Sequence, residues 1–383
     1  MVSGDPLNRT GGGFSQACDL SAARCPISKD VLKERRVACE IMPDKVSSRP
    51  SGAGPGWVSA HTANGKSWFG RSGIARQLVS LAIVTAIFAI GTRGKYLSGA
   101  NLQVILSLAA IPAIIAIGLH QVVVFGGIDL SVEGVVALCV VFVGFLAHNK
   151  FNSNDVGLWI VPIVVGFGGI TGIVNGLLNT KLRIPSFIST LGMSWVLWGL
   201  AVFVSKGQTI PLLENPLTRF VNGTFFGIPN LALVATALFI VIQVIQDRTR
   251  FGRYMYAVGG DEALAAQAGV DVDMTKIIVF AIAGIFYGLS ALFLAVQLDS
   301  AQAITGNNLL FPAITAVAVG GVALTGGIGG AKNAALGALI VTALNDGLIL
   351  MNVNPYAQEA VNGIVLVVAV ALTIDRQKLG FIK

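Results

Sequence analysis

The strongest constraint on this chain is a series of apolar segments that are nearly all long enough to cross a lipid bilayer. A helix needs about 20 apolar residues to span the hydrocarbon core. The chain is 54% hydrophobic and only 12% charged, so we expect an all-α polytopic membrane protein whose transmembrane domain covers residues 74–375. About ten spans are predicted, at residues 74–90, 102–125, 131–147, 156–178, 185–204, 228–245, 276–298, 309–324, 333–351 and 357–374.

Basic residues predict the orientation of these spans. Residues 1–76 hold eleven basic and six acidic side chains, which account for most of the net charge of +7. Basic flanks stay in the cytoplasm, and an even number of spans then places both termini there. The loops that this count assigns to the cytoplasm are also the more basic ones, apart from the outer loop that holds Arg93 and Lys95. The positive charge therefore indicates topology and not nucleic-acid binding.

The two ends of the chain look different from the spans. Residues 1–73 are rich in Gly, Ser, Pro and charge, which predicts a disordered cytoplasmic tail, and they are also compatible with a mis-assigned start site. Cys18, Cys25 and Cys39 lack the close paired spacing of a zinc site, so we interpret them as reduced thiols. Residues 376–383 are expected to form a short cytoplasmic tail.

Glycine has two roles in the apolar segments. Gly168, Gly172 and Gly176 recur every four residues, as do Gly284 and Gly288, a spacing that lets helix backbones approach closely. Glycine pairs at 126–127 and within 320–330 instead predict broken helices, whose freed backbone must be buried in protein or line a cavity. Broken helices in both halves of a transporter often mark the substrate site.

Two acidic residues follow the first glycine pair. A structural interpretation makes Asp129 the N-cap of the next span and puts Glu133 in its first turn, where the helix dipole favours a carboxylate. A functional interpretation lets both line a polar path for a hydroxyl-rich solute, because residues four apart share one helix face. His120, which is next to Gln121 in the preceding span, is either a packing group or a further member of this path.

The sequence contains no complete catalytic or nucleotide-binding motif. Gly65-Lys66-Ser67 resembles the end of a phosphate-binding loop, but Ala60 replaces the required glycine and no apolar strand precedes it. The three histidines have no ligand spacing or hydrolase partners. We therefore expect a transport subunit that is not an enzyme and binds no cofactor, with any ATP bound by another polypeptide.

The longest cytoplasmic loop, residues 246–275, contains a short predicted helix. After a break at Gly259-Gly260, Asp261 can cap a helix over residues 262–268 that Gly269 ends. This compact, alanine-rich helix is either an ordinary surface helix or a contact for a partner ATPase.

Residues 74–374 resemble the membrane permeases of bacterial ABC importers of the ribose, xylose and galactose class. The matching motifs are residues 127–132 (GIDLSV), 184–193 (IPSFISTLGM), 249–254 (TRFGRY) with 257–260 (AVGG), and the glycine-rich stretch 320–339. The resemblance implies a core of two permeases that form a homodimer, with cytoplasmic ATP-binding subunits that hold ATP and Mg²⁺, and a periplasmic sugar-binding protein. It further implies that Asp261, Glu262, Ala263 and Gly269 belong to a coupling helix that contacts the ATPase.

The chain departs from the family pattern at two acidic positions. Glu133 stands where the family usually has glycine, and Asp346 separates Asn345 from Gly347, where an Asn-Gly pair is common; we count Asn345 among the path candidates. The resulting expectation is a multi-pass permease of the bacterial inner membrane that imports a monosaccharide, with a pentose such as ribose or xylose favoured. A nucleoside or amino acid permease and an ion-coupled secondary transporter are the alternatives.

Overall fold

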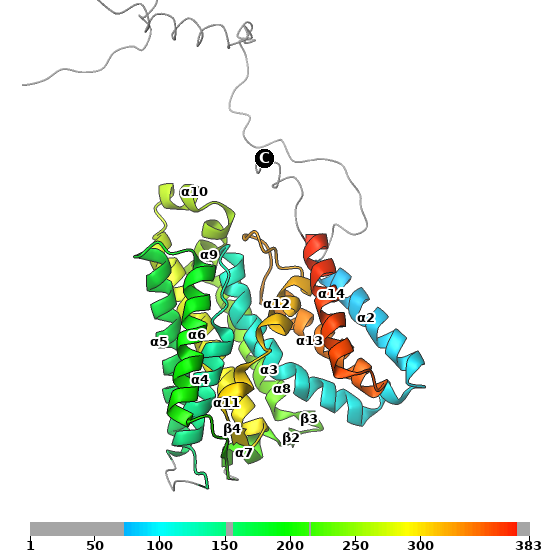
Figure 1. Cartoon of the computed structure of the whole chain (residues 1–383). Helices are drawn as coiled ribbons and strands as arrows, with labels where there is room; N and C mark the ends of the chain where they lie inside the picture. Colours follow the sequence, from blue (N-terminus) through cyan, green and yellow to red (C-terminus); the bar gives the residue numbers. More distant parts are fainter. Residues whose placement is uncertain (1–72, 151–155, 214–215, 374–383) are drawn as a thin grey trace, which may run out of the picture. The chain divides into compact units, whose positions relative to one another are not determined.

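The computed structural model of the chain describes residues 73–150, 156–213 and 216–373 (Figure 1). The tails expected at residues 1–73 and 376–383 lie outside this range, apart from Gly73, which begins the first described helix.

Helices dominate the described residues. Seven of them are long and apolar enough to cross a membrane, and three shorter apolar helices accompany them. These ten segments correspond one by one to the predicted spans, which confirms the all-α polytopic fold. They contain α2 (Gly73–Gly91), α3 (Gly99–Val124), α4 (Val132–Leu146), α5 (Ile160–Thr180), α6 (Ser186–Ser205), α8 (Asn230–Arg248), α11 (Val272–Gln297), α12 (Leu310–Val319), α13 (Ala331–Leu350) and α14 (Pro355–Thr373).

Short elements connect the spans at both ends. They are the 3₁₀ helices η2 (Lys95–Leu97), η3 (Gly157–Trp159) and η4 (Ala303–Gly306), the helices α7 (Pro216–Val221), α9 (Arg250–Gly260) and α10 (Glu262–Gln267), and the strands β1 (Ile210–Pro211), β2 (Thr224–Phe225), β3 (Ile228–Pro229) and β4 (Ser300–Ala301). Strand β1 pairs antiparallel with β4, and β2 with β3. Figure 1 shows α10 at one end of the bundle and α7, β2 and β3 at the other, which we call the α10 end and the α7 end.

The core of the bundle lies around α3 and α11. Helix α11 packs against α3, α4 and α5, while α13 packs against α2, α3 and α12. The second half of α3 is almost entirely buried, from Ile114 to Val124. Peripheral α2 instead exposes apolar side chains such as Ile83, Ile87 and Ile90, as expected of a helix that faces lipid.

The predicted glycine contact joins α5 to α11. A Cβ atom at Gly168 would lie 2.3 Å from the carbonyl oxygen of Gly284, and one at Gly172 would lie 2.1 Å from that of Phe280. Both distances are too short for any side chain. The four-residue glycine spacing therefore serves close helix packing, as predicted.

Candidate functional site

The first glycine break is a short non-helical segment between α3 and α4. Gly126 has a φ of +91°, which ends α3 in a conformation that other residues rarely adopt. The backbone N–H groups of Ile128 and Leu130 donate to the hydroxyls of Ser186 and Thr190 on α6, at 3.0 and 2.9 Å. The backbone freed by the break is thus satisfied by a neighbouring helix, as a membrane interior requires.

Asp129 lies in this break and is only 1% exposed. Its Oδ1 atom accepts hydrogen bonds from the backbone N–H of Ser131 at 2.9 Å and from the Ser131 hydroxyl at 2.6 Å. The Asn175 amide of α5 donates to the same hydroxyl at 3.0 Å, and the Tyr287 hydroxyl of α11 lies beside the carboxyl. Asp129 therefore belongs to a buried polar cluster that joins three parts of the bundle.

The predicted N-cap role of Asp129 is wrong. Helix α4 begins at Val132 with Ser131 in the capping position, and Ser131 makes no side-chain cap. The Asp129 carboxylate bonds two residues ahead, a local turn that delays the start of the helix. Because Asp129 precedes α4, it does not share a helix face with Glu133, contrary to the expectation from their spacing.

Glu133 lies in the first turn of α4, as predicted. Its side chain is partly exposed, and its Oε1 atom accepts from the backbone N–H of Leu310 at 3.3 Å. Leu310 is the first residue of α12, so the carboxylate satisfies one of the free N–H groups at the positive end of a second helix. Glu133 consequently joins α4 to α12.

His120 is fully buried in α3 and contacts Gln246 of α8. The Gln246 side-chain Oε1 accepts from the backbone N–H of Ala331 at 3.0 Å. The NH₂ group of Gln246 therefore faces His120 and donates a hydrogen bond to its Nε2 atom at 2.6 Å. Together His120 and Gln246 hold the first residue of α13, a packing role for a residue that was also predicted to line the path.

The second glycine break separates α12 from α13. The predicted span 309–324 is helical only to Val319, because Gly321, Gly326, Gly327 and Gly329 all have positive φ. Its freed backbone is again held by neighbouring side chains. The carbonyl oxygen of Gly320 accepts from Gln77 of α2 and Asn333 of α13, and that of Gly329 accepts from the Tyr256 hydroxyl of α9 at 2.6 Å.

The two breaks lie against each other although about 200 residues separate them in the sequence. The backbone N–H of Gly327 donates to the carbonyl of Val124, the last residue of α3, at 2.7 Å. A Cβ at Gly326 would lie 3.0 Å from the Cα atom of Gly126. The folded chain thus brings both predicted breaks into direct backbone contact.

Gly259 does not break the chain, contrary to the prediction. Helix α9 continues through Gly259 and Gly260. A Cβ atom at Gly259 would lie 1.9 Å from the Val124 carbonyl oxygen and 2.8 Å from the Gly327 nitrogen. Glycine is needed here because α9 packs directly on the backbone where the two breaks join.

The short predicted helix is present as α10, at the α10 end of the bundle (Figure 1). The Asp261 side chain caps it by accepting from the backbone N–H of Leu264 at 3.0 Å, and Gly269 follows it with a φ of +83°. Glu262 pairs with Lys276 of α11 at 2.7 Å. Ala263 and Leu264 remain exposed, Leu264 by 61%, so α10 presents a small apolar surface.

Asn345 lies apart from the other path candidates. It is 14 residues beyond Ala331 on α13, which corresponds to about 21 Å along the helix. Its neighbour Asp346 is buried and accepts from Asn101 at 2.9 Å. Tyr96 donates to the Ala343 carbonyl at 2.7 Å, and burial, followed by the charge of Asp346, raises the pKa of Tyr96 to about 12.

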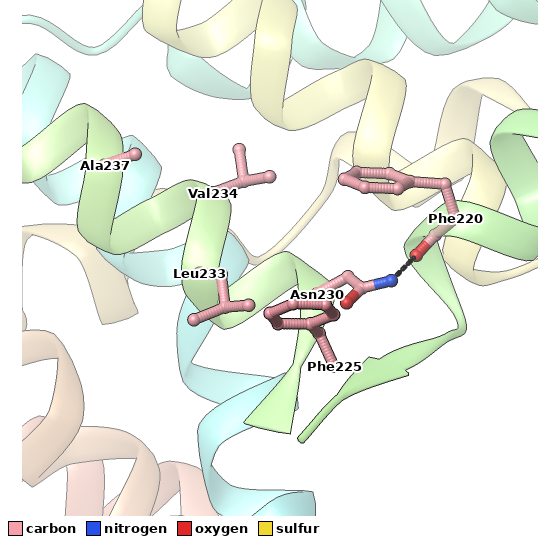
Figure 2. A pocket seen from close by; sticks show the side chains of 6 residues that line it. All are labelled: Phe220, Phe225, Asn230, Leu233, Val234 and Ala237. Carbon is pink, nitrogen blue, oxygen red and sulfur yellow. Dashed lines mark hydrogen bonds between the residues drawn. The ribbon is translucent and has the colours of Figure 1, made fainter. Parts of the chain in front are cut away.

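A pocket of about 480 Å³ opens on the α7 side of α8 (Figure 2). Its lining is apolar except for Asn230, whose side-chain amide donates to the Phe220 carbonyl at 2.8 Å. None of the sequence-predicted site residues lines it. One amide that is already bonded to the backbone offers little to a hydroxyl-rich solute, so we place the candidate site at the two breaks.

Several residues of this site escaped the sequence analysis. Gln246 and Tyr256 hold the second break, but isolated polar residues near helix ends have no spacing that indicates such a role. Ser186 and Thr190 lie in one of the quoted family motifs, and a search for hydroxyls opposite the first break could have found them.

The sequence of the chain is similar to those of known membrane permeases. The family model described as a branched-chain amino acid transport system permease component matches residues 101–370. The ribose import permease protein RbsC of Bacillus subtilis is 35% identical over 74% of this chain and 87% of its own length. The probable ABC transporter permease protein YphD of Escherichia coli is 33% identical over 78% of this chain and 88% of its own length. The galactose/methyl galactoside import permease protein MglC of Escherichia coli is 31% identical over 77% of this chain and 91% of its own length. No solved structure matches the chain.

Proposed function

The chain belongs to the permease-component family of ABC transporters, and on this premise we propose that it imports a monosaccharide, preferably a pentose such as ribose or xylose. Family membership also makes it a transport subunit and not an enzyme, and it removes the ion-coupled secondary transporter from the alternatives. The substrate is the open question.

Support for a sugar comes from the relatives. One is named for ribose import and another for galactose and methyl galactoside import, at 35% and 31% identity. The second candidate is another small polar solute such as a nucleoside or an amino acid. The family description supports the amino acid, because it names branched-chain amino acids.

The proposed assembly has three kinds of component. A second copy of this chain completes the membrane part as a homodimer, a cytoplasmic subunit binds ATP and Mg²⁺, and a periplasmic protein delivers the sugar. Both termini face the cytoplasm of a bacterial inner membrane. The α10 surface, with Asp261, Glu262, Ala263 and Gly269, receives the ATP-binding subunit.

One observation carries this proposal most directly. Helix α9 packs on the backbone contact between the two helix breaks, and α10 follows it after one residue. A displacement of α10 by a partner therefore has a short mechanical route to the broken helices. Such a displacement drives transport only if the partner contacts the inward-open and outward-open states differently.

The candidate path residues have distinct places in this scheme. Asp129 and Glu133 flank the start of α4 and His120 lies in the last two turns of α3, so all three are near the first break. Asn345 is assigned to the other end of the path. The partly exposed Glu133 and Asn345 offer a carboxylate and an amide to sugar hydroxyls, whereas the buried Asp129 and His120 support the path from within the protein.

Uptake measurements test the proposed substrate. Bacteria that lack their own pentose and galactose importers are given this chain with the ATP-binding and solute-binding proteins that co-purify with it from its native membrane. We expect accumulation of labelled ribose or xylose that stops when ATP is depleted. Accumulation of labelled leucine or adenosine in place of sugars would contradict the sugar and support the second candidate.

A further inference from the structure

Three segments from distant parts of the sequence meet at a single hydrogen bond. The N–H group of Gly327 donates to the Val124 carbonyl, and Gly259 of α9 lies directly against both atoms. We refer to Val124, Gly259 and Gly327 as the glycine joint. The nearest atoms around Gly259 are backbone atoms of Val124 and Gly327, and no side chain fits at this position.

We propose that the glycine joint passes displacements of α9 and α10 to both helix breaks at once. The inference rests on the proposed function, in which an ATP-binding subunit docks on α10. It assigns Gly259 and Tyr256 as positioning residues for transport, although neither contacts the solute.

Helices α9 and α10 are joined in a way that suits force transmission. Asp261 ends α9 and is also the N-cap of α10, so only one residue separates the two helices. Its side chain fixes the first turn of α10 by accepting from Leu264. At the other end, Thr249 caps α9 by accepting from Gly252 at 3.4 Å. Because a single capping residue joins the two helices, we expect α9 to follow a displacement of α10.

Helix α9 contacts the second break twice. Tyr256 and Gly259 are three residues apart and therefore lie on the same helix face. The Tyr256 hydroxyl donates to the Gly329 carbonyl at 2.6 Å, while Gly259 contacts Gly327. A rotation or shift of α9 consequently displaces residues 327–329 as a unit.

The joint also reaches the first break. Val124 is the last residue of α3, two residues before Gly126. Packed backbone atoms leave no side-chain rotamers to absorb a small shift, so movement at Gly259 is passed to α3 as well. Gly126 lies next to the joint in the first break and Gly326 in the second. Both have positive φ, so the backbone there can adapt without strain.

Two neighbouring glycines provide a matched test. Gly259→Ala inserts a methyl group into the joint, whereas Gly260→Ala has no heavy atom within 4 Å of its Cβ. Both variants are made in the full chain, with its native cysteines replaced and Ile328→Cys as a reporter, since Ile328 is 60% exposed and lies inside the second break. The complex with its ATP-binding subunit is reconstituted in lipid nanodiscs, and the maleimide labelling rate is measured before and after trapping with ATP and vanadate.

We expect trapping to change the labelling rate about fivefold in the parent and in Gly260→Ala, the scale of a typical coupling between sites. In Gly259→Ala this change should disappear while ATP hydrolysis continues. An equal change in Gly259→Ala and Gly260→Ala would overturn the proposal.

A second variant guards against misfolding of Gly259→Ala. Tyr256→Phe removes only the hydrogen bond to Gly329, and Tyr254→Phe on the same helix is its control, because Tyr254 is 41% exposed. We expect a smaller trapping response in Tyr256→Phe alone; equal responses in the two variants would count against the joint.

If the parent complex neither binds the ATP-binding subunit nor hydrolyses ATP, the proposed function fails, and the joint fails with it for lack of a driving motion. Hydrolysis without a labelling response in the parent would refute the joint alone.

Discussion

Two carboxylates near the first helix break are held by different kinds of partner. Asp129 is buried and accepts from both the backbone and the hydroxyl of Ser131, within a cluster that includes Asn175. Glu133 is partly exposed and accepts from the first N–H of α12. The buried acid has its hydrogen bonds inside the protein, whereas the exposed acid keeps part of its surface for a second partner. Glu133 is therefore the more accessible candidate for contact with solute.

The Glu133→Gln substitution separates a structural from a transport role. The glutamine oxygen can still accept from Leu310, so we expect normal membrane insertion and a loss of no more than about 1 kcal/mol from the weaker helix-dipole interaction. Uptake of the transported sugar should change if Glu133 lines the path. The exposed Glu359 of α14 offers a control in Glu359→Gln, and uptake equal to the parent in both variants would remove Glu133 from the path.

Elements of this fold are positioned by glycine in two physically different ways. In α5 and α11, glycines remain helical and allow the two backbones to touch. Between α12 and α13, glycines with positive φ end one helix and redirect the chain. Gly259 combines features of both, since it is helical and also contacts a break.

Helix packing between α5 and α11 can be tested with two substitutions in α5. Gly172→Ala would place a methyl group 2.1 Å from the Phe280 carbonyl oxygen, and such overpacking typically costs about 1–3 kcal/mol. Gly166→Ala has nothing within 4 Å of its Cβ and serves as the control. We expect thermal unfolding in detergent at lower temperature for Gly172→Ala only. Similar unfolding temperatures for both variants would show that the helices can separate without loss of stability.

At the scale of the whole molecule, the exposed α10 surface and the two breaks form one connected unit. The α10 end carries the candidate partner contact, and the joint behind it holds α3, α9 and the chain between α12 and α13. The pocket near Phe220, on the α7 side of α8, shares no residue with this unit. The pocket therefore has no part in the coupling that we propose between α10 and the breaks.

Partner docking on α10 predicts a local effect of charge. Leu264 is 61% exposed on α10, and Leu158 is 73% exposed in η3 at the start of α5. We expect Leu264→Glu to reduce co-purification of the ATP-binding subunit by about tenfold or more, because a charge would be desolvated in the contact. Leu158→Glu should retain the subunit. Retention by both variants would place the docking surface elsewhere.

The sequence by itself determined the all-α polytopic class, the positions of the ten apolar segments, the two glycine breaks, the α10 helix with its cap and the family of the chain. These features depend on apolar run length, glycine content and local capping, which act within a few residues of each other. Only the tertiary structure decided that the two breaks touch and that Gly259 packs on them instead of breaking its helix. It also decided that Asp129 bonds Ser131 and that Gln246 links His120 to α13. Most of these contacts join residues from separate helices. The Asp129 contact is a choice between two local hydrogen bonds, a helix cap or a turn to Ser131. In both cases the packing of the helices decides which contact forms.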